Sequence, residues 1–297
     1  MDIRVLRYFL VVAKEGSITK AAQRLYITQP TLSRQLHELE EEIGLPLLLR
    51  DGRKITLSQE GRLLYRHAED LVERFRIMED ELQNFSPDAV CGDIYIGSGE
   101  SEGFRCIARA ANSLHAEYPA IRFHFYSSDA DTIMERLDFG LLDFGIFVEP
   151  AIINKYNSIA LPHREEWGLL MRADHPLARK KSVSPQDLDG LPLFLSRQQY
   201  SPESTELSRW LKRDSGSLNI VGTFNLLYNV SLLVEEGMGL ALCIRFDTHR
   251  HTVNNPLLCF RPLDPPLSSG LTFVWRKKEL LSDAARLFLD RLLADLD

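Results

Sequence analysis

Apolar residues follow a helical period in the N-terminal part of the chain and form strand-length runs in the rest. Up to about residue 85 they recur three and four positions apart, as on one face of an amphipathic helix. From residue 92 onwards, short apolar runs alternate with amphipathic segments. The pattern predicts a group of helices followed by a larger α/β region.

Two short helices joined by a tight turn are predicted for residues 17–43. Ser17 can accept hydrogen bonds from free N–H groups at the start of the first helix, and Thr28 can do so for the second. Pro30 falls in the first turn of the second helix, where a missing N–H costs little. The second helix carries one apolar stripe, made of Leu32, Leu36, Leu39 and Ile43. This stripe faces the domain core, so the opposite face is free.

Polar side chains gather on that free face, near the N-terminal end of the second helix. Groups of this kind bind base edges and phosphates in a DNA groove. The candidate DNA contacts on this helix are Thr28, Gln29, Pro30, Thr31, Ser33, Arg34 and His37. Phosphates would repel the glutamates at 38, 40, 41 and 42, so only the first two turns are expected to enter the groove. Most amphipathic helices are plain core helices, but two capped helices at this spacing favour a DNA-binding pair.

A two-stranded wing is predicted for residues 44–57, where two short apolar runs flank a basic Asp-Gly turn. Arg50, Arg53 and Lys54 would project from it beside the second helix. Three such charges in isolation indicate a solvated turn. Beside a DNA-binding helix pair, the same charges are predicted to contact phosphates.

A long helix is predicted from Ser58 to about Phe85, followed by a break at Ser86-Pro87-Asp88. Its apolar residues alternate four and three apart, which is the heptad spacing of paired helices. They are Leu64, Ala68, Leu71, Phe75, Met78, Leu82 and Phe85. The helix could instead pack on its own domain. Its length and its place after the wing favour pairing with a second copy, so that two recognition helices read an inverted repeat.

Strands and helices alternate through the rest of the chain as β-α-β units, which build parallel sheets. In the first unit the expected strands are residues 93–97, 121–125 and 144–148. In the second they are residues 167–171, 191–195, 220–224 and 240–244, with helices near 203–213 and 226–236. Two such units imply two lobes with a cleft between them. A last strand at 271–275 and a helix from Ser282 are expected to return to the first lobe.

Polar residues follow the carboxyl ends of four predicted strands, which is where open α/β sheets bind ligands. The candidate ligand contacts are Ser98, Gly99, Glu100, Ser101, Ser128, Asp129, Ser196, Arg197 and Asn225. Helix capping is an equal alternative for Ser101, Asp129 and Asn225. The mixture of Glu100, Asp129 and Arg197 favours a ligand with both an amine and a carboxylate, or a polar neutral ligand, over a dianion.

The N-terminal sequence resembles the winged helix-turn-helix of LysR-type transcriptional regulators. The resemblance rests on residues 9–13 (Phe-Leu-Val-Val-Ala), 17–22 (Ser-Ile-Thr-Lys-Ala-Ala), 28–36 (Thr-Gln-Pro-Thr-Leu-Ser-Arg-Gln-Leu) and 57–61 (Leu-Ser-Gln-Glu-Gly). Leu48 departs from the phenylalanine that is usual in the family's Leu-Phe-x-Arg run, but it keeps the apolar contact.

The resemblance implies a multi-domain fold: an N-terminal all-α winged helix-turn-helix with a long linker helix, and a C-terminal α/β two-lobed effector-binding domain similar to periplasmic binding proteins. The expected domains are residues 1–58 (DNA binding), 59–88 (linker or dimerisation helix and hinge) and 89–297 (effector binding). Within the last, lobe one comprises 91–161 and 268–297, and lobe two comprises 162–267. Crossings near Leu161-Pro162 and Arg261-Pro262 would be the hinges.

The resemblance also implies a function, the sequence-specific regulation of transcription in response to a small-molecule effector. The target would be double-stranded promoter DNA with an inverted repeat, and the candidate ligand contacts would line the inducer pocket. Effector binding would shift the population of lobe arrangements and with it DNA spacing, bending or contact with RNA polymerase. The family forms dimers and tetramers, and activates more commonly than it represses.

Charge and composition agree with a two-part soluble regulator. The 297 residues suggest about two domains, and 44% apolar residues is ample for buried cores. The first 62 residues carry ten Lys and Arg against eight Asp and Glu, although the whole chain has a formal net charge of −7. A mildly positive head suits local DNA contact rather than wrapping. Because no apolar run has the length of a membrane span and no signal peptide is visible, we expect a cytoplasmic protein.

Other chemistry finds little support in the sequence. It contains no Ser-His-Asp signature, G-x-S-x-G elbow, P-loop, Rossmann fingerprint or H-E-x-x-H, so neither an enzyme nor a cofactor site is expected. A DNA-binding enzyme is one alternative to a regulator, and a scaffold that binds proteins through the long helix is another. Structural thiols, rather than the peroxide-sensing disulfide of some LysR-type proteins, are expected at Cys91, Cys106, Cys243 and Cys259. His249 and His251 with Cys259 are too weak a signal for a metal site.

Overall fold

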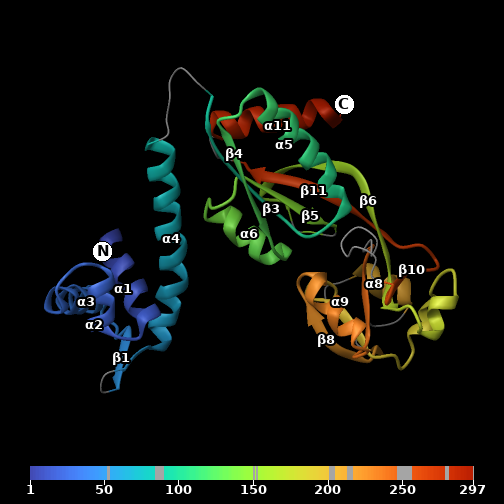
Figure 1. Cartoon of the computed structure of the whole chain (residues 1–297), viewed down its shortest axis with the longest axis horizontal. Helices are drawn as coiled ribbons and strands as arrows, with labels where there is room; N and C mark the ends of the chain where they lie inside the picture. Colours follow the sequence, from blue (N-terminus) through green and yellow to red (C-terminus); the bar gives the residue numbers. More distant parts are fainter. Residues whose placement is uncertain are drawn as a thin grey trace. The chain divides into compact units, whose positions relative to one another are not determined.

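A computed structural model describes residues 1–51, 54–83, 90–149, 151, 153–200, 205–212, 217–245, 256–277 and 281–296 (Figure 1). The chain divides into two units, the first of which contains the long helix α4 (Gln59–Gln83). Phe85 and the predicted break at Ser86-Pro87-Asp88 lie outside the described residues.

The first unit begins with three helices, α1 (Ile3–Glu15), α2 (Ile18–Arg24) and α3 (Gln29–Ile43). Both predicted caps are confirmed. Ser17 Oγ accepts a hydrogen bond from the Lys20 N–H at 3.4 Å, and Thr28 Oγ1 accepts one from the Thr31 N–H at 3.3 Å. Gly44 ends α3 in the left-handed conformation, which a residue without Cβ adopts at little cost. Short local signals thus define where these helices begin and end.

The core of the first unit lies where these helices meet. Leu32, Leu36 and Leu39 are buried on one side of α3, as the stripe predicts, whereas Ile43 is partly buried. Ala21 and Ala22 are buried beside them, and their small side chains let α2 pack closely. The opposite side of α3 therefore remains free for another molecule.

The wing and the start of α4 are joined through a serine and a glycine. Strands β1 (Leu48–Asp51) and β2 (Lys54–Leu57) pair antiparallel, which confirms the wing. Ser58 Oγ donates a hydrogen bond to the Pro46 carbonyl at 2.7 Å and accepts one from the Gly61 N–H at 2.8 Å. A Cβ on Gly61 would lie 2.1 Å from the Leu47 carbonyl oxygen, so this close approach requires glycine.

Lobe one of the second unit is built on a mixed sheet. Its strands are β3 (Gly92–Ser98), β4 (Ile121–Ser127), β5 (Phe144–Val148), β6 (Tyr156–Arg172) and β11 (Ser268–Arg276). They run in the order β4-β3-β5-β11-β6, with β3 parallel to β4 and β5 as predicted. β11 pairs antiparallel with β5 and β6, so the predicted return of the chain to lobe one is confirmed.

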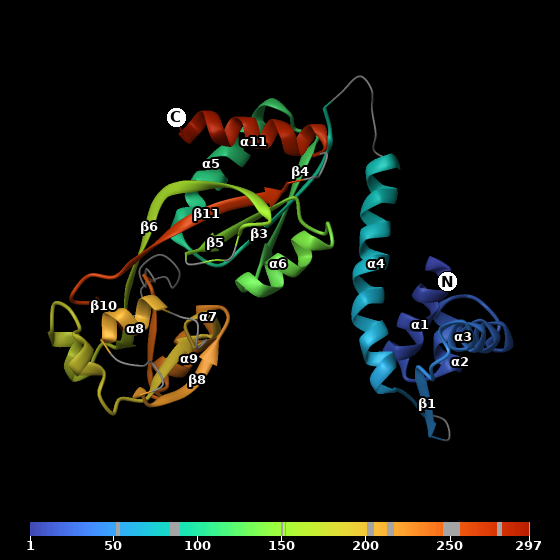
Figure 2. The same ribbon diagram turned by 180° about the vertical axis from the view of Figure 1, so that it is seen from behind.

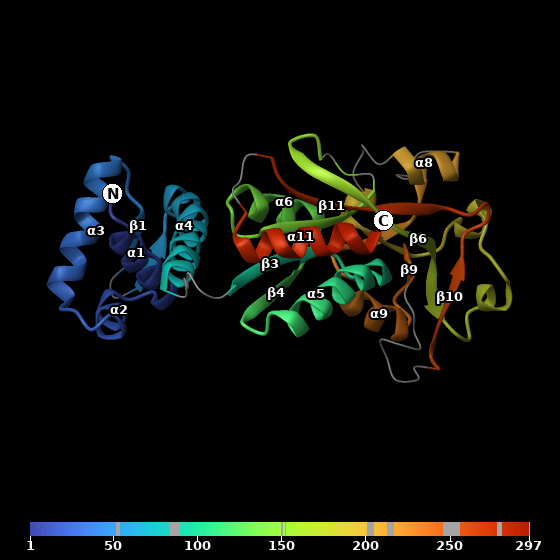
Figure 3. The ribbon, with the colours of Figure 1, turned by 90° about the horizontal axis from the view of Figure 1, so that it is seen from above.

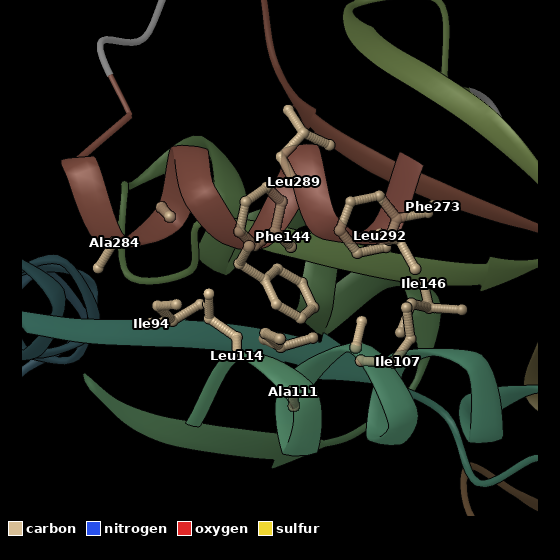
Figure 4. Close-up of a cluster of buried hydrophobic side chains, with 14 of the residues drawn as sticks. Ile94, Ile107, Ala111, Leu114, Phe144, Ile146, Phe273, Ala284, Leu289 and Leu292 are labelled. Carbon is tan, nitrogen blue, oxygen red and sulfur yellow. The ribbon is translucent and has the colours of Figure 1, made fainter. Parts of the chain in front are cut away.

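Helices cover both faces of this sheet. They are α5 (Arg105–Glu117), α6 (Ala130–Asp138) and α11 (Asp283–Leu296), with a short 3-10 turn at Glu102–Phe104. α5 and α11 lie side by side over one face (Figure 3), where Ile94, Phe144 and Leu292 belong to a continuous core (Figure 4). α6 packs on the other face through Ile133 and Leu137. The central strand β5 is buried between these helices and is apolar throughout, which explains its strand-length apolar run, whereas the edge strand β4 is largely exposed.

Lobe two continues the sheet from β6 (Figure 2). Its strands are β7 (Leu193–Ser196), β8 (Ile220–Phe224), β9 (Leu240–Ile244) and β10 (Leu258–Pro262). Its helices are α7 (Arg197–Tyr200), α8 (Thr205–Leu211) and α9 (Leu227–Glu235), with 3-10 turns at Pro176–Arg179 and Pro185–Leu188. β7 is parallel to β8 and β9, as predicted, whereas β6 is antiparallel to β9 and β10. The sequence did not predict β10 or the two 3-10 turns.

The two crossings between the lobes differ from the predicted hinges. Leu161 and Pro162 lie within β6, a single strand of 17 residues whose two ends belong to different lobes. Pairing with β11 shifts register there, because Gly270 pairs with Arg164 and Leu271 with Leu161. Pro162 falls in this bulge, where its missing N–H breaks no ladder bond. Arg261 and Pro262 belong to β10 in lobe two, so the return crossing comes after them, before Ser268.

A buried carboxylate joins two strands at the edge of lobe one. The Asp93 side chain, on β3, is 4% exposed. It accepts hydrogen bonds from Arg122 Nε at 2.8 Å and Arg122 Nη2 at 2.7 Å, and His124 Nε2 lies 2.7 Å from its Oδ1 atom. Burial raises the pKa of Asp93, but the hydrogen bonds from Arg122 and His124 outweigh burial, so that its pKa is lower than usual. The charged carboxylate thus stabilises the pairing of β3 and β4.

Candidate DNA-binding surface and ligand cavity

The N-terminal turns of α3 expose the polar side chains predicted to contact DNA. Thr28, Gln29, Pro30, Thr31, Arg34 and His37 are exposed, and Ser33 is partly buried. The apolar stripe on the opposite side is buried in the core of the first unit. The helix therefore offers hydroxyl, amide, imidazole and guanidinium groups on a surface that no described part of this unit covers.

The Arg34 and His37 side chains on this surface are held only loosely. Arg34 Nε lies 3.6 Å from Glu38 Oε1, and His37 Nε2 lies 3.4 Å from Glu41 Oε1, each pair one helical turn apart. All four side chains are more than half exposed. Pairs of this kind contribute about 0.3–0.5 kcal/mol, so a DNA phosphate or base can displace the glutamate at little cost.

Glu40 connects α3 to the wing. Its Oε1 atom accepts hydrogen bonds from the N–H groups of Leu47 at 2.7 Å and Leu48 at 2.9 Å, at the start of β1. The sequence indicated only that phosphates would repel this glutamate. In the structure, the Glu40 carboxylate also holds the wing beside α3 through these two hydrogen bonds. Lys54 is exposed at the start of β2, whereas Arg53 and the side chain of Arg50 lie outside the described residues.

A cavity of about 270 Å³ lies between the two lobes of the second unit. Eight of the nine predicted ligand contacts line it, namely Gly99, Glu100, Ser101, Ser128, Asp129, Ser196, Arg197 and Asn225. Ser98 does not line the cavity. Its side chain is buried, and its hydroxyl donates a hydrogen bond to the Gly99 carbonyl at 2.7 Å. The loops after β3, β4, β7 and β8 thus meet at one place, although they are distant in the sequence.

The apolar walls of the cavity were missed by sequence reasoning. They include Ile146, Val148, Trp167, Phe224, Leu226, Leu227, Tyr228, Cys243 and Ile244. Most of these residues belong to strands or helices that also supply the core, and an apolar strand residue looks the same in a core and in a cavity wall. The rule that ligands bind at the carboxyl ends of strands was applied to four strands. Applied also to β5 and β9, which end at the cavity, it could have identified some of these residues.

Polar groups from both lobes meet across the cavity. Arg197 Nη1, in lobe two, lies 3.7 Å from Asp129 Oδ2 in lobe one. Gln198 Nε2, also in lobe two, donates a hydrogen bond to the Val148 carbonyl in lobe one at 3.3 Å. The lobes are therefore connected by an ion pair and a hydrogen bond beside the space a ligand would occupy.

The alternative of helix capping applies to some of the predicted residues and not to others. Asp129 Oδ1 accepts a hydrogen bond from the Thr132 N–H at 3.0 Å, which caps α6. Asn225 does not cap α9, whose N-cap Leu226 has no side-chain cap bond; its Oδ1 atom accepts a hydrogen bond from the Leu226 N–H at 2.9 Å. Ser101 makes no cap bond, and its buried Oγ has no hydrogen-bond partner in the part of the chain that the structure describes. An unpaired buried hydroxyl in a cavity wall is available to a ligand.

The charged residues of the cavity are paired unequally. Arg197 is paired with Asp129, and Arg245 Nε donates a hydrogen bond to Glu166 Oε2 at 2.8 Å. The Glu100 carboxylate, in contrast, makes no ion pair within residues 90–149 or the other described segments. A cation in the cavity would thus find an unpaired carboxylate, whereas an anion would have to compete for an arginine.

The described cysteines and histidines form neither a disulfide nor a metal site. Cys91, Cys106, Cys243 and Cys259, all among the described residues, form no disulfide, and burial raises the pKa of the last three. Among the residues that the structure describes, no three His, Cys, Asp or Glu side chains are placed to hold a metal ion, and His249 and His251 lie outside them. In the same residues, no helix is long and apolar enough to cross a membrane.

Comparisons with known proteins place both units in one family. Residues 3–62 match the family model described as bacterial regulatory helix-turn-helix protein, lysR family, and residues 87–297 match the LysR substrate binding domain. The uncharacterized HTH-type transcriptional regulator YwbI of Bacillus subtilis (strain 168) is 30% identical over 295 residues, which cover 98% of this chain and 95% of that protein. The Hca operon transcriptional activator HcaR of Escherichia coli (strain K12) is 26% identical over 291 residues, which cover 94% of this chain and 93% of that protein.

Solved structures agree with these matches. CbnR, a LysR family transcriptional regulator, has a TM-score of 0.76 at 17% identity, with 100% of each chain covered, and shows the same fold. HinK, a LysR family transcriptional regulator from Pseudomonas aeruginosa, has a TM-score of 0.55 at 25% identity, covering 99% of this chain and 98% of that one. The chain belongs to the LysR family of DNA-binding transcriptional regulators.

Proposed function

We propose that this LysR-family regulator reads an inverted repeat in promoter DNA through α3 and the wing of two copies, under the control of a small molecule in the cavity between its lobes. The observation that carries the proposal is the surface of α3, whose polar N-terminal turns are exposed above a buried apolar stripe. The cavity supplies the second part, because both lobes line it. Such a protein acts where the chromosome is, in the cytoplasm.

Contacts with DNA divide by chemistry along α3 and the wing. Gln29 and Arg34 are assigned to base edges, because an amide suits adenine and a guanidinium suits guanine. Lys54, with Arg50 and Arg53, is assigned to phosphates beside the groove. The glutamates from Glu38 onwards keep the later turns of α3 away from the DNA backbone. Base contacts give selectivity, and phosphate contacts give affinity.

Pairing of two copies is assigned to one side of α4. The predicted heptad seam is divided in the structure, because Ala68 is buried against the unit's own core and Arg7 lies over the ring of Phe75 at 5.3 Å. Leu71, Met78 and Leu82 are 45%, 41% and 70% exposed. These three apolar side chains, spaced seven and four apart, form the side that a second α4 would cover. Tetramers, and contact with RNA polymerase at the promoter, follow from the family resemblance.

The cavity favours a small ligand with an apolar body and a charged amine. Its volume of about 270 Å³ is near the lower limit for ligand pockets, about 300 Å³. Apolar walls would cover the body, the Ser101 hydroxyl would take one hydrogen bond, and the Glu100 carboxylate would pair with the amine. A zwitterion or a polar neutral molecule suits these groups better than a dianion, because Arg245 is bound to Glu166 and only Arg197, loosely paired with Asp129 at 3.7 Å, can take a carboxylate.

Footprinting on the intergenic region beside the protein's own gene tests the DNA part of the proposal. Two protected half-sites whose centres are about 34–36 Å, or a multiple of that distance, apart are expected if two copies bind on one side of the duplex. Protection should disappear with Arg34→Ala. A single protected half-site would contradict pairing, and absence of protection would favour a scaffold over a regulator that binds this region.

A further inference from the structure

Tyr26 occupies an unusual position in the turn between α2 and α3. Its φ is 56°, in the left-handed region that side chains other than glycine rarely adopt. Its side chain is 96% exposed. Within the described residues only Lys212, with a φ of 55°, shares this conformation without being glycine.

The turn is held by its backbone and not by the phenol. The Leu25 N–H donates to the Ala21 carbonyl at 2.9 Å, the Tyr26 N–H to the Gln23 carbonyl at 3.2 Å, and the Ile27 N–H to the Ala22 carbonyl at 3.1 Å. Glycine would make the same bonds in this conformation without strain. The chain therefore keeps an aromatic residue where the fold itself favours glycine, and the ring contacts almost nothing in its own chain.

The position of the turn indicates what the ring contacts. Tyr26 lies two residues before the cap Thr28 and three before Gln29, the first residue of α3. Both of these residues are exposed at the end of α3 that is assigned to DNA. When this end enters the major groove, the turn before it comes close to the sugar-phosphate backbone that borders the groove. A phenol hydroxyl donates well to a phosphate oxygen.

We propose that Tyr26 is a DNA-backbone contact, whose hydroxyl donates a hydrogen bond to a phosphate beside the groove that α3 enters. The inference rests on the proposed docking of α3. Because the phenol is neutral, its contact releases no counterion, so it adds affinity without adding to the salt dependence of binding. Because a phosphate is the same at every base pair, the contact serves all sequences alike.

Binding of the full-length protein to a random-sequence duplex at several salt concentrations tests the inference, and no operator needs to be known. Tyr26→Phe removes only the hydroxyl and should weaken binding about 10- to 150-fold, the range expected for one hydrogen bond to a charged group. Its salt slope should equal that of the wild type. Lys54→Ala should weaken binding and also flatten the slope, because a charged contact is lost.

Glycine variants test whether the side chain serves binding or the fold. Tyr26→Gly should bind DNA as poorly as Tyr26→Phe, while its melting temperature equals or exceeds that of the wild type, because the strain is relieved. Lys212→Gly is the matched control. It should relieve the same strain in lobe two and leave DNA binding unchanged. A fall in melting temperature with Tyr26→Gly would overturn the inference, since the side chain would then support the fold.

The outcomes separate this inference from the proposal on which it rests. If Tyr26→Phe binds within twofold of the wild type while Lys54→Ala loses affinity, Tyr26 makes no phosphate contact and the docking of α3 and the wing stands. If neither variant loses affinity, the docking itself is wrong. If both variants lose affinity, Tyr26→Phe with the salt slope of the wild type and Lys54→Ala with a flatter one, the phosphate contact of Tyr26 and the docking of α3 are both supported.

Discussion

Replacing Glu40 by alanine should loosen the wing from α3. The Glu40 carboxylate accepts two backbone hydrogen bonds, from the N–H groups of Leu47 at 2.7 Å and Leu48 at 2.9 Å. The Leu47 and Leu48 residues are only 1% and 9% exposed, so water has little access to these donors. Glu40→Ala therefore leaves two poorly hydrated N–H groups without their acceptor.

The size of the effect follows from the number and kind of these bonds. One hydrogen bond to a charged group contributes about 1.5–3 kcal/mol to the free energy of unfolding. Glu40 itself is partly exposed and water can replace part of the loss, so Glu40→Ala should cost about 3 kcal/mol for the two bonds together. Glu40→Gln keeps a neutral acceptor oxygen and should cost about half as much.

The matched control is Glu41→Ala, one residue along the same helix. The Glu41 side chain is 67% exposed and, among the described residues, pairs only with His37, at 3.4 Å, so its loss should cost less than about 0.5 kcal/mol. Urea unfolding of the full chain, followed by circular dichroism, compares the free energies. Hydrogen exchange of a peptide that contains Leu47 and Leu48 reports on the two amides directly. Equal stability of the two variants, with unchanged exchange, would refute the reasoning.

Three other perturbations test separate parts of the account. Arg34→Ala should weaken binding to operator DNA by about 1–3 kcal/mol and leave random DNA nearly unaffected, because a base contact is lost; equal losses in competition binding would exclude that contact. Met78→Glu combined with Leu82→Glu, at positions 41% and 70% exposed, should yield folded monomers in analytical ultracentrifugation and circular dichroism, and a persisting dimer would contradict pairing through α4. The pKa of Asp93 is lower in the folded than in the unfolded chain, so its stabilisation is complete above the unfolded value of about 3.9 and is lost as the pH falls through the folded value. Urea midpoints of the wild type should therefore fall more steeply below about pH 4 than those of Asp93→Asn, and parallel curves would count against this interpretation.

The helices and the exposed face of α3 proposed to bind DNA could be predicted because their signals are local. A cap such as Thr28, a proline in the first turn and an apolar stripe each act within one helix, so the sequence contains the whole argument. Glu40 could not be predicted, because its hydrogen bonds reach residues seven and eight positions away through a turn. Sequence reasoning counted only its charge, and the geometry of the wing decides its role.

The cavity residues whose position follows from the sheet topology were predicted, and those whose position follows from side-chain packing were missed. Ser101 and Asn225 follow strands, and the carboxyl ends of parallel strands meet at one edge. Trp167 gives no such signal, because a buried aromatic residue in a strand resembles any core residue. Pro162 misled in a different way: it was predicted to mark a hinge between the lobes, but a bulge lets strand β6 continue through it. Ser98 also failed, since its side chain is buried and bonds its own loop.

The central claim, regulation of DNA binding by a small molecule in the cavity, is tested most directly by one binding measurement. The full-length protein is mixed at fixed salt with fragments of its own genome, including the intergenic region beside its gene, and excess random competitor DNA, with and without a panel of metabolites rich in small amines and zwitterions. We predict that one fragment is retained against competitor and that one metabolite changes this retention. Selective retention that no metabolite alters would contradict the role of the cavity, and no selective retention under any condition would contradict the claim as a whole.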